Sequence, residues 1–158
     1  MVEQLKQILR EQLHLLRAAA CVLEESRGRV ASFADRLGGE LSVGERESCE
    51  ALTSRFARLN DFLVQRVFRT LDQIELMDEG SPLDRLQRAE ARSLIASAER
   101  WRELRMLRNA IAHDYLIESA DRVLLDTLAA SPELLETADR LVCYVDQKQY
   151  CQGKGEKR

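Results

Sequence analysis

Apolar residues recur at intervals of three and four along most of this chain, which is the spacing of amphipathic helices and not the alternation of strands. The first such stripe runs from residue 2 to about 26 and extends more weakly to the glycine pair Gly38-Gly39. A second stripe begins at Ser42, which stands three residues before Glu45 in the spacing of a capping box, and continues to about Met77. The pattern therefore predicts two long helices joined by a loop over about 38–44.

Three further helices are predicted. Ser81-Pro82 places an N-cap serine before a proline at the first helical position, which indicates a short helix over about 82–89. From about 91 to 113 there is no glycine or proline and the apolar positions keep helical spacing, so a third long helix is expected there. Ser131-Pro132 repeats the start signal for a last helix that runs to about 150. We expect residues 153–158, Gly-Lys-Gly-Glu-Lys-Arg, to form a flexible tail.

Composition agrees with one helical domain over residues 1–152. The 158 residues are 45% hydrophobic and include two prolines and seven glycines, enough for one good core with few helix breakers. The predicted architecture is all-α, an antiparallel bundle of four to five helices. Bundles of this size commonly pair through a leftover apolar face, so a homodimer is expected.

The same sequence gives expectations about location and cofactors. No apolar stretch approaches the length of a membrane span, and the start of the chain lacks a basic and then apolar signal, so we expect a cytoplasmic protein with no membrane partner. The four cysteines are scattered without C-x-x-C spacing, so neither a metal nor a cofactor nor a disulfide framework is expected. The net charge of −3 argues against coating nucleic acid through bulk electrostatics and leaves room for a localised basic site.

The candidate chemistry lies in the segment from Arg108 to Tyr115, Arg-Asn-Ala-Ile-Ala-His-Asp-Tyr, at the end of the predicted third helix. At about 100° per residue, Arg108 lies inside the apolar arc of that helix. This arc also holds Trp101, Leu104, Ala112 and Tyr115. A guanidinium among apolar neighbours needs a partner, because burying it unpaired costs several kcal/mol. An internal carboxylate and an external phosphate both satisfy that need, and the sequence leaves both open.

A polar stripe adjoins this arginine. It is formed by Arg102, Arg105, Asn109 and His113. His113 is one of two histidines in the chain, and histidine is the side chain type that is best suited to exchange a proton near neutral pH. Asn109 stands one turn before His113 and can orient the imidazole. If Arg108 holds a phosphate, the three residues suffice to cleave RNA without a metal, through the adjacent 2′-hydroxyl. Arg102 and Arg105 are candidate RNA contacts.

A single helix does not bring Arg108 and His113 together. Arg108 and His113 are separated by roughly 140° around the axis and by about 7.5 Å along it. A symmetric dimer that apposes two such helices would gather two arginines and two histidines in one cleft. If the chain is an enzyme, we expect the dimer to be the functional unit.

The motif resembles a known family. Arg108-Asn109-x-x-x-His113 is similar to the signature of the HEPN superfamily, and the extension His113-x-Tyr115 resembles the HepT-like toxins, as does the approach from Trp101 to Leu107. The resemblance implies a HEPN-like bundle and a dimeric, metal-independent endoribonuclease toxin of a type VII-like toxin-antitoxin pair. It assigns Arg108 and His113 as the catalytic pair and Asn109 as a supporting residue.

The resemblance also implies a partner. Tyr115 becomes the hydroxyl to which a cognate minimal nucleotidyltransferase antitoxin transfers AMP, which silences the toxin. Phosphates added beside Arg108 and His113 would occupy their anion site and block RNA. Asp114 falls at the variable position of the family pattern and receives no role.

Two other interpretations remain open. In the first, the chain keeps the HEPN fold without cleavage, as a non-catalytic partner or substrate-binding subunit of a nucleotidyltransferase. In the second, it is a plain helical adaptor in which Arg108 is salt-bridged internally and His113 caps a helix C-terminus.

Overall fold

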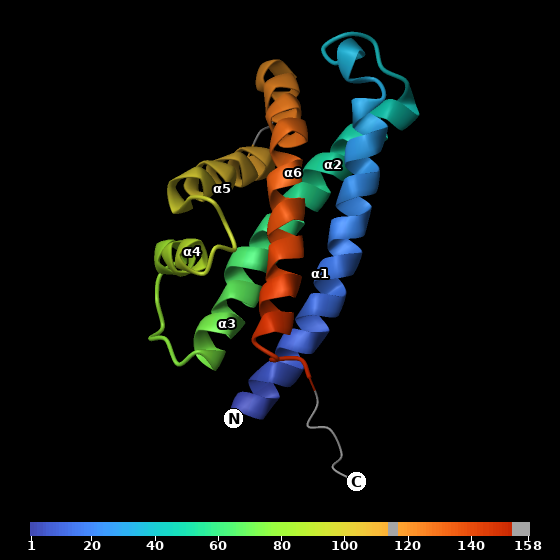
Figure 1. Cartoon of the computed structure of the whole chain (residues 1–158). Helices are drawn as coiled ribbons and strands as arrows, with labels where there is room; N and C mark the ends of the chain where they lie inside the picture. Colours follow the sequence, from blue (N-terminus) through green and yellow to red (C-terminus); the bar gives the residue numbers. More distant parts are fainter. Residues whose placement is uncertain (114–116, 153–158) are drawn as a thin grey trace.

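The computed structural model of this protein describes residues 1–113 and 117–152, and this part of the chain is helical without strands (Figure 1). Helix α1 spans Val2–Ala31, and a short 3-10 turn, η1, follows over Ala34–Arg36. The all-α prediction and the extent of the first helical stretch are confirmed. The predicted tail, residues 153–158, lies outside the described residues.

The second predicted helix is a continuous helical run with an irregularity in its middle. Helix α2 spans Val43–Asp61, a π-helical segment, η2, spans Phe62–Val67, and helix α3 spans Phe68–Ile74. The capping box is present: the Ser42 hydroxyl accepts from the Glu45 amide at 3.1 Å, and the Glu45 carboxylate accepts from the Ser42 amide at 2.9 Å. The prediction is confirmed in its start and extent, and the π segment is new.

The third predicted helix begins later than the sequence pattern indicated. Helix α4 spans Pro82–Ala91 and helix α5 spans Ala98–His113, so the helix predicted from about 91 starts only at Ala98. Ser93 adopts a left-handed φ of 60°, and the Leu94 amide then donates to the Ala89 carbonyl at 2.9 Å, as in a helix C-cap. Leu94 is buried all the same. An apolar residue that packs from a turn is indistinguishable, by spacing alone, from one that packs from a helix.

Helix α6 spans Ile117–Gln147, so the start predicted at Ser131-Pro132 is wrong and Pro132 lies inside the helix. The Ser131 hydroxyl donates to the Thr127 carbonyl at 2.7 Å, and the Thr127 hydroxyl donates to the Val123 carbonyl at 2.7 Å. These bonds satisfy buried hydroxyls around the position where the proline removes an amide donor. Ala130 and Leu134 are buried on either side, so packing against the core maintains the helix through the proline.

The long helices form a bundle in which α1 runs opposite to its neighbours (Figure 1). The run α2–η2–α3 and helix α6 both return along α1, and these two share a direction because α4 and α5 intervene between them in the chain. The antiparallel prediction therefore holds for α1 against each of the other two. The largest fully buried side chains come from α1, the run α2–η2–α3, α4 and α5, and include Leu9, Leu16, Leu23, Phe56, Leu63, Phe68, Leu71, Leu86 and Leu104.

Helices α4 and α5 lie to one side of the long helices and cross them (Figure 1). Trp101 fixes the first turns of α5: it is buried and its ring centroid lies 6.0 Å from that of Phe68 in α3. On the same turn, the Arg100 guanidinium donates to the Glu133 carboxylate of α6 from Nε at 3.0 Å and from Nη2 at 2.7 Å. The start of α5 is thus held to both α3 and α6.

A half-buried polar network ties α3, α4 and the end of α6 together. Arg92 follows α4 directly. Its Nη1 lies 2.7 Å from Oδ1 of Asp72, and its Nε donates to Oε2 of Glu75 at 2.9 Å. The hydroxyls of Tyr144 and Tyr150 donate to the same Glu75 carboxylate at 2.6 and 3.1 Å. Burial by itself would raise the pKa of Glu75, but the hydrogen bonds from Tyr144 and Tyr150 and the charge of Arg92 outweigh it and lower that pKa. Burial and the bond to Glu75 raise the pKa of Tyr144 to about 12.

We expect Glu75→Gln to lower the free energy of unfolding at pH 7 by about 1–3 kcal/mol, because the hydroxyls and Arg92 lose a charged acceptor. The folded pKa of Glu75 is lowered, so its contribution is complete above the ordinary value of 4.5 and is lost as pH falls through the folded pKa. The difference between wild type and variant should therefore shrink in urea titrations at decreasing pH. Glu136→Gln, in the exposed pair with Arg140, is the matched control and should change stability little. If the difference in free energy of unfolding between wild type and Glu75→Gln grew as the pH fell, the result would contradict this account.

We expect Pro132→Ala to raise the free energy of unfolding by about 1–2 kcal/mol, because alanine restores an amide donor and relieves the ring clash, while the unfolded chain gains some entropy. Pro132 is exposed, so the substitution opens no cavity in the core. Urea unfolding measures the change, and Asp139→Ala, also exposed in α6, controls for helix propensity. A loss of stability in Pro132→Ala would mean that α6 is interrupted at this proline.

Candidate functional site

Five predicted site residues lie on α5, and His113 is its last residue. They are Arg102, Arg105, Arg108, Asn109 and His113. Tyr115, the predicted AMP acceptor, and the neighbouring Asp114 lie outside the described residues. The geometry of the site is therefore that of the last two turns of α5 and of the elements packed against them.

Arg108 is paired internally with Asp61, the last residue of α2. Its Nε donates to one carboxylate oxygen at 2.8 Å and its Nη2 donates to the other at 2.7 Å. The side chains are 31% and 40% exposed, so the pair sits at the edge of the core and within reach of solvent. Of the two partners that the sequence left open, an internal carboxylate and an external phosphate, the structure contains the first.

The apolar arc predicted around Arg108 is buried where it precedes this residue along α5 but not at Ala112, which follows it. Trp101 and Leu104 are buried, whereas Ala112 is exposed. The apolar face of α5 continues instead through Leu107 and Ile111, which are partly buried against the core. Arg108 therefore stands on the border between the packed face and the solvent-facing face of the helix.

The contact with Asp61 leaves part of the guanidinium unused. The hydrogen bonds to Asp61 raise the pKa of Arg108, which keeps the group cationic. A guanidinium has five N–H donors in a planar fork, and the contact uses the edge formed by Nε and Nη2. The N–H groups of the end-on edge, those of Nη1 and the second N–H of Nη2, point away from this contact, and their geometry suits two oxygens of a phosphate.

Three of the other four predicted residues on α5 face solvent. Asn109 and His113 are exposed, and Arg102 is exposed and lies 3.3 Å from Glu99. Arg105 is partly buried. Among the hydrogen bonds between described residues, none joins Arg108 to Asn109 or His113. One protomer thus directs Arg108 toward α2 and leaves His113 at the end of α5, as the separation on a single helix predicts.

Asp61 is the site residue that the sequence analysis missed. It lies 47 residues from Arg108, and nothing in the spacing of the chain connects the two. The available signal was the Asn60-Asp61 pair, two polar residues in the middle of a long apolar stripe. Asn60 is buried, and its Nδ2 has no hydrogen-bond partner among the described residues. The π segment begins immediately after Asp61, and such segments are frequent at functional sites.

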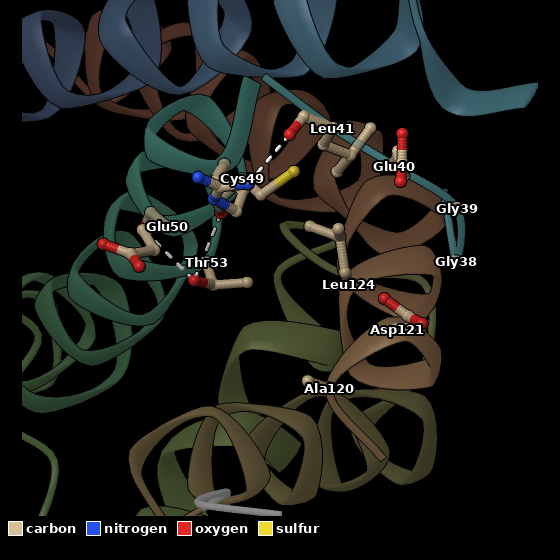
Figure 2. Close-up of a pocket in the computed structure, with 11 residues that line it drawn as sticks. Gly38, Gly39, Glu40, Leu41, Cys49, Glu50, Thr53, Ala120, Asp121 and Leu124 are labelled. Carbon is tan, nitrogen blue, oxygen red and sulfur yellow. Dashed lines mark hydrogen bonds between the residues drawn. The ribbon is translucent and has the colours of Figure 1, made fainter. Parts of the chain in front are cut away.

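A cleft between α2 and α6 holds none of the predicted residues (Figure 2). It has a volume of about 690 Å³ and lies between the 38–41 loop, α2 and α6, where Leu41 and Leu124 form apolar walls. Burial, together with the charge of Asp121, raises the pKa of the Cys49 thiol in this cleft. The carboxylates of Glu40 and Asp121 disfavour an anion there, and the protonated thiol is a poor nucleophile.

A second groove follows α5 itself. It has a volume of about 470 Å³ and lies between α5 and α6. Most of its lining residues are apolar and include Met106, Ala110 and Val123, and the charged side chains of Arg100, Glu103 and Asp126 also line it. Met106 is 71% exposed, an unusual setting for a large apolar side chain. Asn109 precedes Ala110, so this apolar surface borders the predicted site.

No protein-family model, curated protein or solved structure matches this chain. In residues 1–113 and 117–152 no group of three or more histidine, cysteine, aspartate or glutamate side chains is arranged to hold a metal ion. The helices within these same ranges lack the length and apolar character needed to cross a membrane.

Proposed function

We propose that this chain is a metal-independent endoribonuclease toxin of a type VII-like toxin-antitoxin system and belongs with the HepT-like HEPN proteins. The observation that carries the proposal is the motif from Arg108 to His113 at the C-terminal end of α5 in a helical bundle. Its arginine is oriented by a carboxylate, and its histidine and asparagine are exposed. These are the positions that the resemblance assigns to the reaction.

In the proposed reaction the RNA supplies its own nucleophile. The end-on edge of Arg108, through Nη1 and the second N–H of Nη2, binds the scissile phosphate, and His113 takes the proton from the adjacent 2′-hydroxyl as that oxygen attacks phosphorus. The bond from phosphorus to the 5′-oxygen breaks and that oxygen receives the proton that His113 took, which leaves a cyclic 2′,3′-phosphate and a 5′-hydroxyl. Asn109 orients His113 or the phosphate, and Arg102 and Arg105 contact the flanking backbone.

The proposed functional unit is a homodimer. Arg108 is turned toward α2 and His113 ends α5, so a second copy is the simplest source of the complementary residue at each site. The apolar groove along α5, with its exposed Met106, supports this by providing a surface next to Asn109 that a second copy would cover. The proposal further includes a cytoplasmic location, RNA as substrate and no resident metal.

The proposed partner is a minimal nucleotidyltransferase antitoxin that transfers AMP to Tyr115. AMP phosphates held near Arg108 would compete with RNA for the same guanidinium edge. This part of the proposal rests on the His113-x-Tyr115 spacing.

A second candidate function has one observation in its favour. The ion pair with Asp61 gives Arg108 a partner within the bundle, so this arginine has a packing role even without RNA. That suits a non-catalytic HEPN subunit that binds a nucleotidyltransferase or presents its substrate, and it suits a plain adaptor.

Expression of the wild-type chain without its partner should arrest growth and cleave RNA, and Arg108→Ala or His113→Ala should reduce cleavage by at least about 100-fold. Growth curves and gel assays on total RNA measure the two effects. His14→Ala is the matched control, because His14 is the other histidine and is exposed on α1. A harmless wild-type chain that is inert on RNA would leave only the non-catalytic interpretations.

Mixing the two inactive variants separates a composite site from an intramolecular one. If each site takes its arginine from one protomer and its histidine from the other, refolded mixtures of Arg108→Ala and His113→Ala chains recover about a quarter of the wild-type rate. If both residues come from one protomer, the mixture stays inactive.

Incubation with the cognate antitoxin and ATP should add the mass of one or more AMP groups and abolish cleavage, and Tyr115→Phe should prevent both effects. Intact-mass spectrometry and the RNA assay measure them. Tyr150→Phe, whose hydroxyl bonds Glu75 far along the chain from the motif, is the control and should still be modified. Unchanged modification of Tyr115→Phe would place the acceptor elsewhere.

A further inference from the structure

We propose that Asp61 is a positioning residue of the site, which acts on the reaction by fixing the guanidinium of Arg108. The inference rests on the proposed function and adds to it a residue from a different helix. Asp61 ends α2 and meets Arg108 of α5 through two nearly equal hydrogen bonds, 2.8 and 2.7 Å. No feature of the motif on α5 points to this residue.

The physical need for such a residue follows from the length of the arginine side chain. An unrestrained arginine carries about 2 kcal/mol of rotamer entropy, which has to be lost when a phosphate is bound. The bidentate contact fixes the guanidinium plane before the substrate arrives. It also determines the direction of the remaining end-on edge, because the guanidinium is planar and the two edges are at fixed angles.

Asp61 is itself well supported. Asn60 precedes it and is buried, and the π segment Phe62–Val67 follows it directly. Leu63, Val64 and Val67 of that segment are buried in the core, so the backbone on both sides of Asp61 is held by packing. A carboxylate presented from such a rigid element positions its partner more reproducibly than one presented from a loop.

A purely electrostatic role predicts the opposite effect of substitution. The charge of Asp61 opposes the attraction of Arg108 for a phosphate, so its removal would by Coulomb's law strengthen binding of an anion. Arg58 and Arg105 stand one turn before Asp61 and Arg108 on their own helices and supply further positive charge. Positioning therefore affects turnover, whereas the charge of Asp61 affects affinity, and the two effects are separable.

The test is a comparison of wild type with Asp61→Asn in the full-length chain, with kcat and KM measured on RNA oligonucleotides that the wild type cleaves. We expect kcat to fall about 10- to 100-fold while KM stays constant or decreases, because a misplaced guanidinium lowers turnover although the local charge is more favourable. Asp61→Glu keeps a bidentate acceptor and should recover part of the lost kcat. Glu24→Gln, the same replacement of a carboxylate by an amide in the exposed pair with Arg27 on α1, is the matched control.

All rates are taken per folded molecule, well below the unfolding midpoint of each variant, so that a merely structural role would leave kcat unchanged. A wild-type kcat in Asp61→Asn overturns the inference and leaves the proposed function intact. A higher kcat in that variant also overturns it, by showing that the pair restrains the enzyme. A wild-type chain that cleaves no RNA overturns the proposed function and the positioning role with it, and this result is recognisable before any variant is made.

Discussion

The end of α5 depends on one interaction, the bidentate ion pair between Arg108 and Asp61. It joins two helices that are far apart in the sequence, and it does so at the border of the core, where Arg108 is 31% exposed. Together with the pair of Arg100 and Glu133 at the other end of α5, it fixes this helix to α2 and to α6. Ion pairs within reach of solvent contribute little to the free energy of unfolding. The main effect of such bidentate contacts is that they fix the orientation of the guanidinium group.

The rest of the bundle gives that pair a rigid setting. Trp101 and Leu104 are buried between α5 and the long helices, and the buried π segment follows Asp61 in α2. The network around Glu75 connects α3, α4 and the end of α6. The consequence is a surface in which α5 is immobilised along its packed face, while Met106, Asn109 and His113 remain accessible on the opposite face.

Arg108 can bind its internal partner Asp61 and an external phosphate at the same time. A guanidinium has five N–H donors, enough for a carboxylate and a phosphate together, so the internal ion pair leaves Arg108 able to bind an anion. It does restrict the direction from which an anion can approach. The separation of Arg108 from His113 on one helix persists in the folded protomer, and a second copy of the chain is the physical remedy that the proposed function invokes.

The sequence by itself determined the helical class, the capping box at Ser42, the N-cap at Ser81 and the position of the motif at the end of a helix, because periodicity and capping are local properties. Only the tertiary structure decided that α6 continues through Pro132 and that α5 begins at Ala98, since packing overrode local signals. It alone decided which carboxylate meets Arg108. That choice depends on how two helices cross, and a pairing across 47 residues leaves no trace in the local pattern.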